Sequence, residues 1–156
     1  MKRRGGSRVR GGSHARGHGH GTGVLRVMLD TNIFDRLERD EEAVSELENR
    51  RDLRLVISGI QLAQLAGIAD AGRRERYLSL AGRLCAKLSA LASGAAGNAC
   101  PPADRHEPDR MIAAAAAARC DILVSDDKGL LEYSKRVGVR AMDWNKFITR
   151  IVFRNH

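Results

Sequence analysis

The sequence has few aromatic residues and no long hydrophobic segment. Aromatic side chains make up 4% of the 156 residues, so a core must be built mainly from the Leu, Ile, Val and Ala among the 43% that are hydrophobic. No apolar segment reaches the roughly 20 residues needed to cross a bilayer. The N-terminus is basic but lacks the apolar segment of a secretory signal. These absences predict a cytoplasmic protein with room for one compact domain.

Cysteine is also scarce. Cys85, Cys100 and Cys120 are widely spaced and form no C-x-x-C pair. This pattern argues against a disulfide framework and favours a reducing compartment. We expect three free thiols in or near the core.

Acidic residues are missing from residues 1–23. Six of the 27 Lys and Arg residues precede residue 24, whereas none of the 19 Asp and Glu residues does, which leaves a net charge of only +2 for the rest of the chain. Gly, Arg, Ser and His dominate this segment, which predicts a disordered basic arm. Such an arm could bind phosphate backbones through counterion release, or it could have no role.

Residues 24–156 predict a single α/β domain. Short apolar runs typical of buried parallel strands alternate with helical patterns. This alternation predicts a parallel sheet of four or five short strands with helices on both faces. The strands are expected at residues 24–29, 53–57, 121–124 and 139–142.

Helices are predicted between these strands. Asp40 and Asp143 are expected to cap helices, and Gly138 to end one. The helix containing the run of alanines at 113–118 should lie close against the sheet. A loop is predicted at 93–108. The helices are expected at 33–39, 41–51, 59–70, 73–91, 110–119, 128–137 and from 144 onward.

Polar side chains follow the strands where each one ends. Asp30 follows the first strand and Asp127 closely follows a later one, while Asp109 begins the alanine-rich helix. Ligands collect at the carboxyl edge of parallel sheets, so we expect these three carboxylates to converge there. Adjacent carboxylates repel each other, and a hard cation such as Mg²⁺ or Mn²⁺ relieves that repulsion.

Each acid also has a purely structural explanation. Asp109 follows Pro108 and could stabilise the start of a helix through the helix dipole. Asp126 or Asp127 could cap the helix that comes next.

Four segments in this order resemble the PIN-domain family of ribonucleases, and most closely its VapC-like branch of bacterial toxin–antitoxin pairs. The similarity covers about residues 24–147. The segments are Leu29-Asp30-Thr31-Asn32, residues 58–65, residues 109–114 and residues 123–129.

The resemblance implies a PIN-like fold and a metal-dependent endoribonuclease that hydrolyses RNA phosphodiester bonds. If the chain follows the family, its catalytic residues would be Asp30, Asp109 and Asp127. They would hold Mg²⁺ or Mn²⁺, and this ion would polarise the phosphate and activate a water molecule. Asn32 and Ser125 would support the site, and Asp126 could add to it. The resemblance also implies a homodimer and a small antitoxin protein that inserts a segment, with an arginine, among the carboxylates.

The chain departs from the family at one position. Where the family has a glutamate after the second strand, this sequence has Gln64, which offers an oxygen but no charge. Three explanations are open: the enzyme works with a reduced site, Asp35 or Glu107 substitutes, or the domain binds RNA or a protein without cleaving. Whether one or two metals bind is also open. Candidate phosphate contacts are Arg73, Arg74, Arg110 and Lys128.

Overall fold

The computed structural model describes residues 23–87 and 107–154. Its centre is a five-stranded sheet in which all paired strands are parallel, in the order β3-β2-β1-β4-β5. The predicted α/β fold with four or five short parallel strands is therefore confirmed. The strands are β1 (Leu25–Leu29), β2 (Leu53–Ile57), β3 (Cys85–Lys87), β4 (Ile122–Val124) and β5 (Arg140–Met142).

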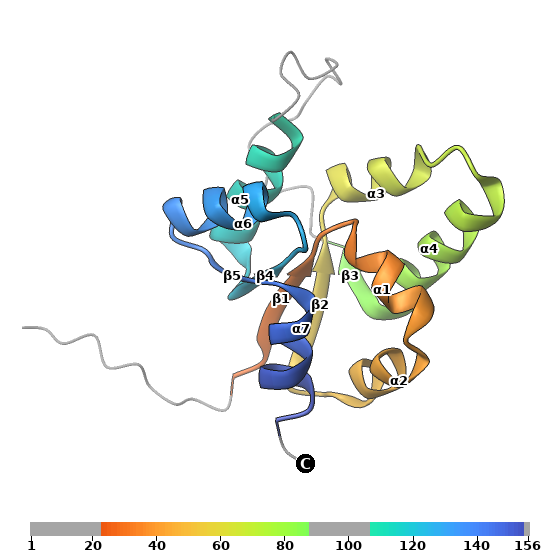
Figure 1. Ribbon diagram of the computed structural model, residues 1–156, viewed down its shortest axis with the longest axis horizontal. Coiled ribbons are helices and arrows are strands. Elements are labelled where there is room, and N and C mark those ends of the chain that lie inside the picture. Colours follow the sequence, from red (N-terminus) through yellow and green to blue (C-terminus); the bar gives the residue numbers. More distant parts are fainter. Residues whose placement is uncertain (1–22, 88–106, 155–156) are drawn as a thin grey trace, which may run out of the picture.

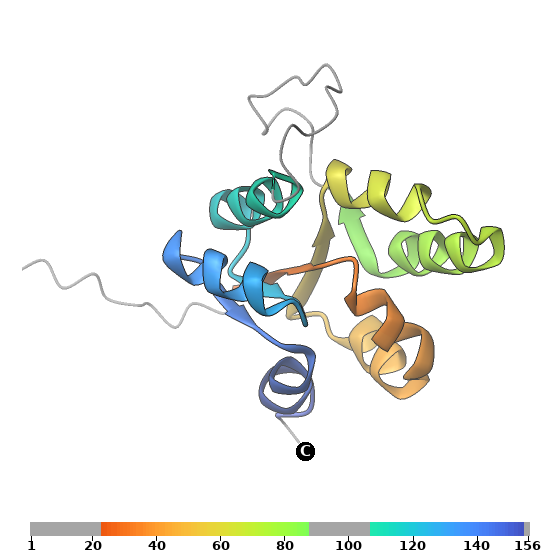
Figure 2. The ribbon, with the colours of Figure 1, turned by 45° about the horizontal axis from the view of Figure 1, so that its top comes forward.

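Helices cover both faces of the sheet, as the alternating pattern predicts. Helices α5 and α6 lie on one side, whereas α1, α2 and α7 lie on the other (Figures 1 and 2). Helix α7 continues into a wider π-helical segment, η2. The helices are α1 (Ile33–Arg39), α2 (Glu41–Asn49), α3 (Gly59–Ala66), α4 (Ala71–Leu84), α5 (Glu107–Arg119), α6 (Lys128–Arg136), α7 (Trp144–Phe147) and η2 (Ile148–Val152).

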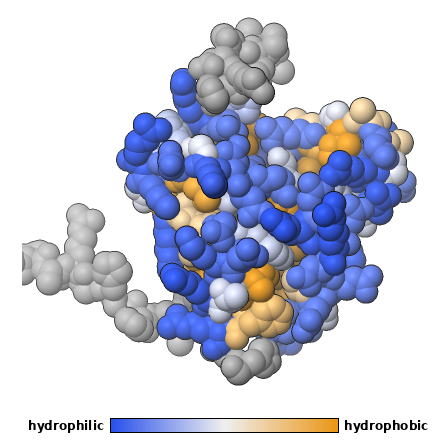
Figure 3. Space-filling model, in the orientation of Figure 1, coloured by the Kyte–Doolittle hydropathy of each residue, from blue (hydrophilic) through white to orange (hydrophobic). Residues whose placement is uncertain are grey.

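Alternation along β1 divides the core in two. Val27 and Leu29 point into the larger cluster, with α1, α2 and α7, while Met28 points into a second cluster with α5 and α6. In α5, Ala113 and Ala116 are fully buried in this second cluster, which confirms that the alanine-rich helix packs closely on the sheet. The face in Figure 3 is largely hydrophilic, with hydrophobic residues in small areas.

Side-chain caps fix several helix ends as predicted. The Asp40 carboxylate accepts from the Ala43 amide at the start of α2, and that of Asp143 accepts from the Lys146 amide at the start of α7. Gly138 follows α6 with a φ of 89°, a left-handed conformation that glycine adopts without strain.

The predicted boundaries around α4 are wrong at both ends. The preceding helix ends at Ala66, not near residue 70, because Asp70 instead caps α4 by accepting from the Arg73 amide. The helix predicted to reach residue 91 ends at Leu84. Cys85–Lys87 pairs with β2 as an edge strand, so tertiary pairing overrides the local helical pattern.

The second half of the chain needs one smaller correction. The loop predicted at 93–108 includes Glu107, but this residue begins α5; Pro108 follows it in the first turn, where proline is tolerated. The rest of that loop, Cys100, and residues 1–22 of the predicted arm lie outside the described residues. Within the described part, Cys85 and Cys120 are free thiols, as expected. No helix in this part is long and apolar enough to span a membrane.

Candidate functional site

The candidate site lies where the direction of the sheet reverses. From β1 the chain adds β2 and β3 on one side, and then returns to add β4 and β5 on the other. Beyond such a point the loops after two adjacent parallel strands diverge and leave a crevice at their carboxyl ends. Asp30 follows β1 and its amide donates to the carbonyl of Val124, the last residue of β4, at 2.9 Å. This bond places Asp30 at the carboxyl edge of β1 and β4.

Asp30 is a buried carboxylate held by two hydrogen bonds. Only 6% of the residue is exposed. Its Oδ1 accepts from the Thr31 amide at 2.8 Å, and its Oδ2 accepts from the Ser125 hydroxyl at 2.7 Å. Burial raises the pKa of Asp30 above its usual value, and the two hydrogen bonds offset part of this rise. The fold thus keeps a carboxylate where its charge is unfavourable.

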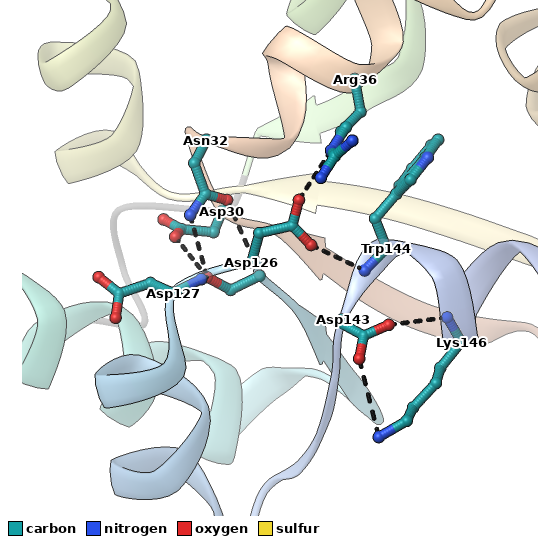
Figure 4. A network of polar contacts seen from close by, with 9 residues as sticks. Asp30, Asn32, Arg36, Asp126, Asp127, Asp143, Trp144 and Lys146 are labelled. Atoms are coloured by element: carbon teal, nitrogen blue, oxygen red, sulfur yellow. Dashed lines mark hydrogen bonds and ion pairs between the residues drawn. The ribbon is translucent and has the colours of Figure 1, made fainter.

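Ser125 connects the residues around Asp30. Its hydroxyl donates to Asp30 and accepts from the Asp127 amide at 3.0 Å and from the Asn32 side-chain amide at 3.4 Å. One donor and two acceptors are all that a serine hydroxyl offers, so this fully buried group is saturated. Figure 4 shows Asp30, Asn32 and Asp127 gathered around this loop. The structure therefore brings together the predicted site residues at 30, 32, 125 and 127.

The other two predicted carboxylates act on Asp30 through their charge. Asp109, in the first turn of α5, and Asp127 both raise the pKa of Asp30 further. Asp127 also fulfils the structural explanation, because its Oδ1 accepts from the amides of Gly129 and Leu130 at the start of α6. Asp127 is thus both the cap of α6 and a neighbour of Asp30.

The carboxylate of Asp126 is hydrogen-bonded to residues outside this network. Its Oδ2 accepts from Arg36 at 2.8 Å, and its Oδ1 accepts from the Trp144 amide at 3.1 Å. In Figure 4 its carboxylate lies on the side of Arg36 and Trp144. Only its backbone amide takes part in the network, by donating to Asn32 Oδ1 at 3.3 Å. Asp126 therefore supports the loop rather than offering an unpaired oxygen to the crevice.

Gln64 faces the site from α3. Its Oε1 accepts from the hydroxyl of Thr31, the residue after Asp30, at 3.4 Å. The position expected to carry a glutamate therefore contacts the residue that follows Asp30, and the side chain there is neutral.

Gln61 is a site-supporting residue that sequence reasoning missed. It is fully buried, and its side-chain amide donates to the Leu29 carbonyl at 2.8 Å while its Oε1 accepts from the Ser58 amide at 2.9 Å. It thereby fixes the start of α3 to the end of β1. The Ser58-x-x-Gln61 spacing of a capping box was the signal that could have identified it.

Several other residues that were candidates for the site have hydrogen-bond partners within the protein. The Asp35 carboxylate accepts hydrogen bonds from Tyr77 and Arg73 of α4. Both bonds lower the pKa of Asp35, and the bond from Tyr77 has the larger effect. Arg74 donates to the Ile68 carbonyl at 3.0 Å. Asp35 is thus an ion-pair partner, and Arg73 and Arg74 have intramolecular acceptors. Glu107, the other proposed substitute, is the first residue of α5.

The chemistry of the site residues fits a hard divalent cation. The donors are carboxylate and amide oxygens, and Asp30 carries a charge that burial and two neighbouring carboxylates disfavour. A cation would remove that penalty. As the side chains stand, the described residues contain no group of three His, Cys, Asp or Glu arranged to hold a metal. Asp127 has one oxygen, Oδ2, that is not used in capping α6.

The raised pKa of Asp30 predicts a pH-dependent effect of Asp30→Asn. The folded state binds this proton more tightly than the unfolded chain does, so the free energy of unfolding falls as pH rises through the folded-state pKa. In a chelator, Asp30→Asn should become more stable relative to wild type as the pH rises from about 4 to 7.5, because only wild type has a bound proton to lose over this range. Urea unfolding of both proteins across this range measures it. A difference in the free energy of unfolding between the two proteins that stays constant over this range contradicts the argument.

Comparison with known proteins supports the fold. No family model and no curated protein matches the chain. Its structure is similar to that of a domain of a functionally unknown protein from Methanocaldococcus jannaschii DSM 2661, with a TM-score of 0.54 and 18% sequence identity over 76% of this chain and 90% of that chain. At this identity the similarity establishes a shared fold and carries no function.

Proposed function

We propose that this protein is a metal-dependent endoribonuclease with Asp30, Asp109 and Asp127 as its acidic centre. The observation that carries the proposal is the buried Asp30, whose pKa both other carboxylates raise, at the carboxyl edge of β1 and β4. A buried carboxylate that other carboxylates repel lowers the free energy of unfolding. Such destabilising groups are typical of functional sites. The PIN-domain resemblance supports the choice of RNA as the substrate.

The roles of the residues follow from their contacts. Asp30, Asp109 and Asp127 would hold Mg²⁺ or Mn²⁺, and the bound ion supplies charge stabilisation at a phosphate and a more acidic water. Ser125 fixes the orientation of Asp30 through the 2.7 Å bond between its hydroxyl and Asp30 Oδ2. Asn32 holds the loop after β4 through Ser125 and the amide of Asp126. These bonds keep Asp30 in position before an ion or substrate arrives.

Cleavage of single-stranded RNA tests the proposal. Wild-type protein should cut a labelled oligonucleotide of mixed sequence in Mg²⁺ or Mn²⁺ and should leave it intact in excess chelator. The internal position of the cuts, read on a sequencing gel, distinguishes an endonuclease from an exonuclease. Intact RNA in millimolar Mn²⁺, with the protein shown to be folded by circular dichroism, would reject the activity.

The neutral Gln64 favours a second candidate, a domain that binds RNA or a protein without cleaving. The residue lies beside Thr31, where a carboxylate would add charge to the centre. Calorimetric titration with Mg²⁺ and Mn²⁺ separates the two candidates. Heat of binding that disappears in Asp30→Asn supports the nuclease, whereas no heat at millimolar metal supports the binding domain.

The partners follow from the resemblance and belong to the same proposal. We propose a cytoplasmic toxin whose activity a small antitoxin blocks by inserting a segment, with an arginine, among the three carboxylates. A homodimer is the expected assembly. The repulsion around Asp30 makes this centre a favourable place for a guanidinium as well as for a metal ion.

A further inference from the structure

Arg36 forms an ion pair with Asp126, which lies in the loop after β4 next to Ser125. It extends from α1, and its Nε donates to Asp126 Oδ2 at 2.8 Å (Figure 4). The other oxygen of Asp126 accepts from the Trp144 amide, so this carboxylate is fixed from two sides. A carboxylate held in this way limits the orientations of the guanidinium that it pairs with.

Most of the hydrogen-bonding capacity of Arg36 is unused. A guanidinium has five N–H donors, and within the described residues only the Nε–H of Arg36 has an acceptor. Its side chain is 52% exposed. Arg50 uses three nitrogens on Asp52 and two carbonyls, and Arg83 uses two on Glu48. In the part of the chain that the structure describes, Arg76, like Arg36, uses only its Nε, on Glu38, but its partner belongs to α1 and not to the loop after β4. Arg36 therefore combines a fixed position with free donors.

The backbone of Asp126 links the ion pair to the residues around Asp30. The amide of Asp126 donates to Asn32, and the adjacent Ser125 donates to Asp30. Arg36 itself lies one helical turn after Asn32 on α1. Three carboxylates repel a phosphodiester, and a cation of the protein nearby would add to the charge stabilisation that a bound metal ion supplies. An arginine fork matches the oxygens of a phosphate.

We propose that Arg36 binds a non-bridging phosphate oxygen of the RNA backbone next to the acidic centre, and that Asp126 is the residue that positions it. The inference rests on the proposed nuclease function and adds a substrate contact to it. Because the contact is to the backbone, Arg36 contributes to affinity and carries no base preference.

Arg36→Gln tests the contact, with Arg39→Gln as the matched control. Both remove one charge from α1, and Arg39 is exposed one turn further from Asn32. Arg36→Gln should raise KM for single-stranded RNA about 10-fold or more with a smaller change in kcat, and should reduce the salt slope of binding by about 0.7. Arg39→Gln should change KM less than about twofold. Arg36→Lys, which keeps the charge, should recover most of the loss.

The positioning role of Asp126 has its own readout. Asp126→Asn retains an oxygen for the Trp144 amide but loses the charge that pairs with Arg36. It should raise KM by less than Arg36→Gln, and the double variant should be no worse than Arg36→Gln alone. The affinity for Mn²⁺, measured by calorimetry, should be the same in Asp126→Asn and Arg36→Gln as in wild type. A loss of Mn²⁺ affinity would show instead that the substitution disrupts the acidic centre.

Binding of labelled RNA in chelator separates this inference from the nuclease proposal. If wild-type protein binds but never cleaves, and Arg36→Gln binds more weakly than Arg39→Gln, the contact stands and the nuclease proposal fails. If wild-type protein cleaves and the two variants have the same KM, the contact is wrong and the nuclease proposal stands. Wild-type protein that neither binds nor cleaves RNA overturns both.

Discussion

Asp109→Asn is expected to reduce metal-dependent RNA cleavage by at least about 100-fold while leaving the fold intact. Asp109 contributes its charge at the acidic centre from the first turn of α5, where it raises the pKa of Asp30. The amide keeps the size of the side chain and removes the charge that a divalent ion requires. Single-turnover cleavage at saturating Mn²⁺ measures the effect.

Glu132→Gln provides the control for this substitution. Glu132 is exposed on α6, so the change removes one negative charge away from the acidic centre. It should alter the cleavage rate by less than about twofold, and urea unfolding should place both variants within about 1 kcal/mol of wild type. Cleavage by Asp109→Asn at the wild-type rate would remove Asp109 from the proposed centre.

Gln64→Glu is expected to tighten Mn²⁺ binding about tenfold, equivalent to about 1.4 kcal/mol. The Oε1 of Gln64 lies 3.4 Å from the Thr31 hydroxyl, so a glutamate there adds a fourth carboxylate to the centre. Cleavage at limiting Mn²⁺ should rise in proportion to occupancy. Without metal the same charge should lower the free energy of unfolding near pH 7, because it adds to the repulsion around Asp30.

Ala63→Glu separates the position of this new charge from its mere presence. Ala63 precedes Gln64 on α3 but is exposed, so the variant has the same net charge as Gln64→Glu without a carboxylate at the crevice. Titration calorimetry should show no gain in Mn²⁺ affinity for Ala63→Glu. Equal affinities for wild type and Gln64→Glu would show that a fourth carboxylate is not what limits this site.

The main elements of the fold are predictable because their signals are local. β2 (Leu53–Ile57) is apolar at every position except one arginine. Asp40 and Asp143 are capping residues that come directly before helices. The edge strand at Cys85–Lys87 is not predictable in this way. It continues the helical pattern of Tyr77 and Leu84 and becomes a strand only because β2 offers a free edge to pair with.

The sequence predicts which residues lie at the candidate site but not which side chains pair with each other there. The positions of Asp30 and Ser125 after strands suffice to place them at one edge of a parallel sheet. Nothing local shows that Asp126 pairs with Arg36, 90 positions away, or that Asp35 pairs with α4. Those pairings depend on how helices pack across the sheet. The capping role of Gln61 is the exception, since its spacing from Ser58 is visible in the sequence.

The wide separation of Asp30 and Ser125 has a consequence during synthesis. The two residues are 95 positions apart and meet only when β4 docks beside β1. A nascent chain on the ribosome can fold its first helices while the serine that orients Asp30, and the acids at 109 and 127, have not yet been added. If the protein is a nuclease, a nascent chain that does not yet contain Ser125 and Asp127 lacks the assembled centre and cannot cleave the RNA of the ribosome that makes it.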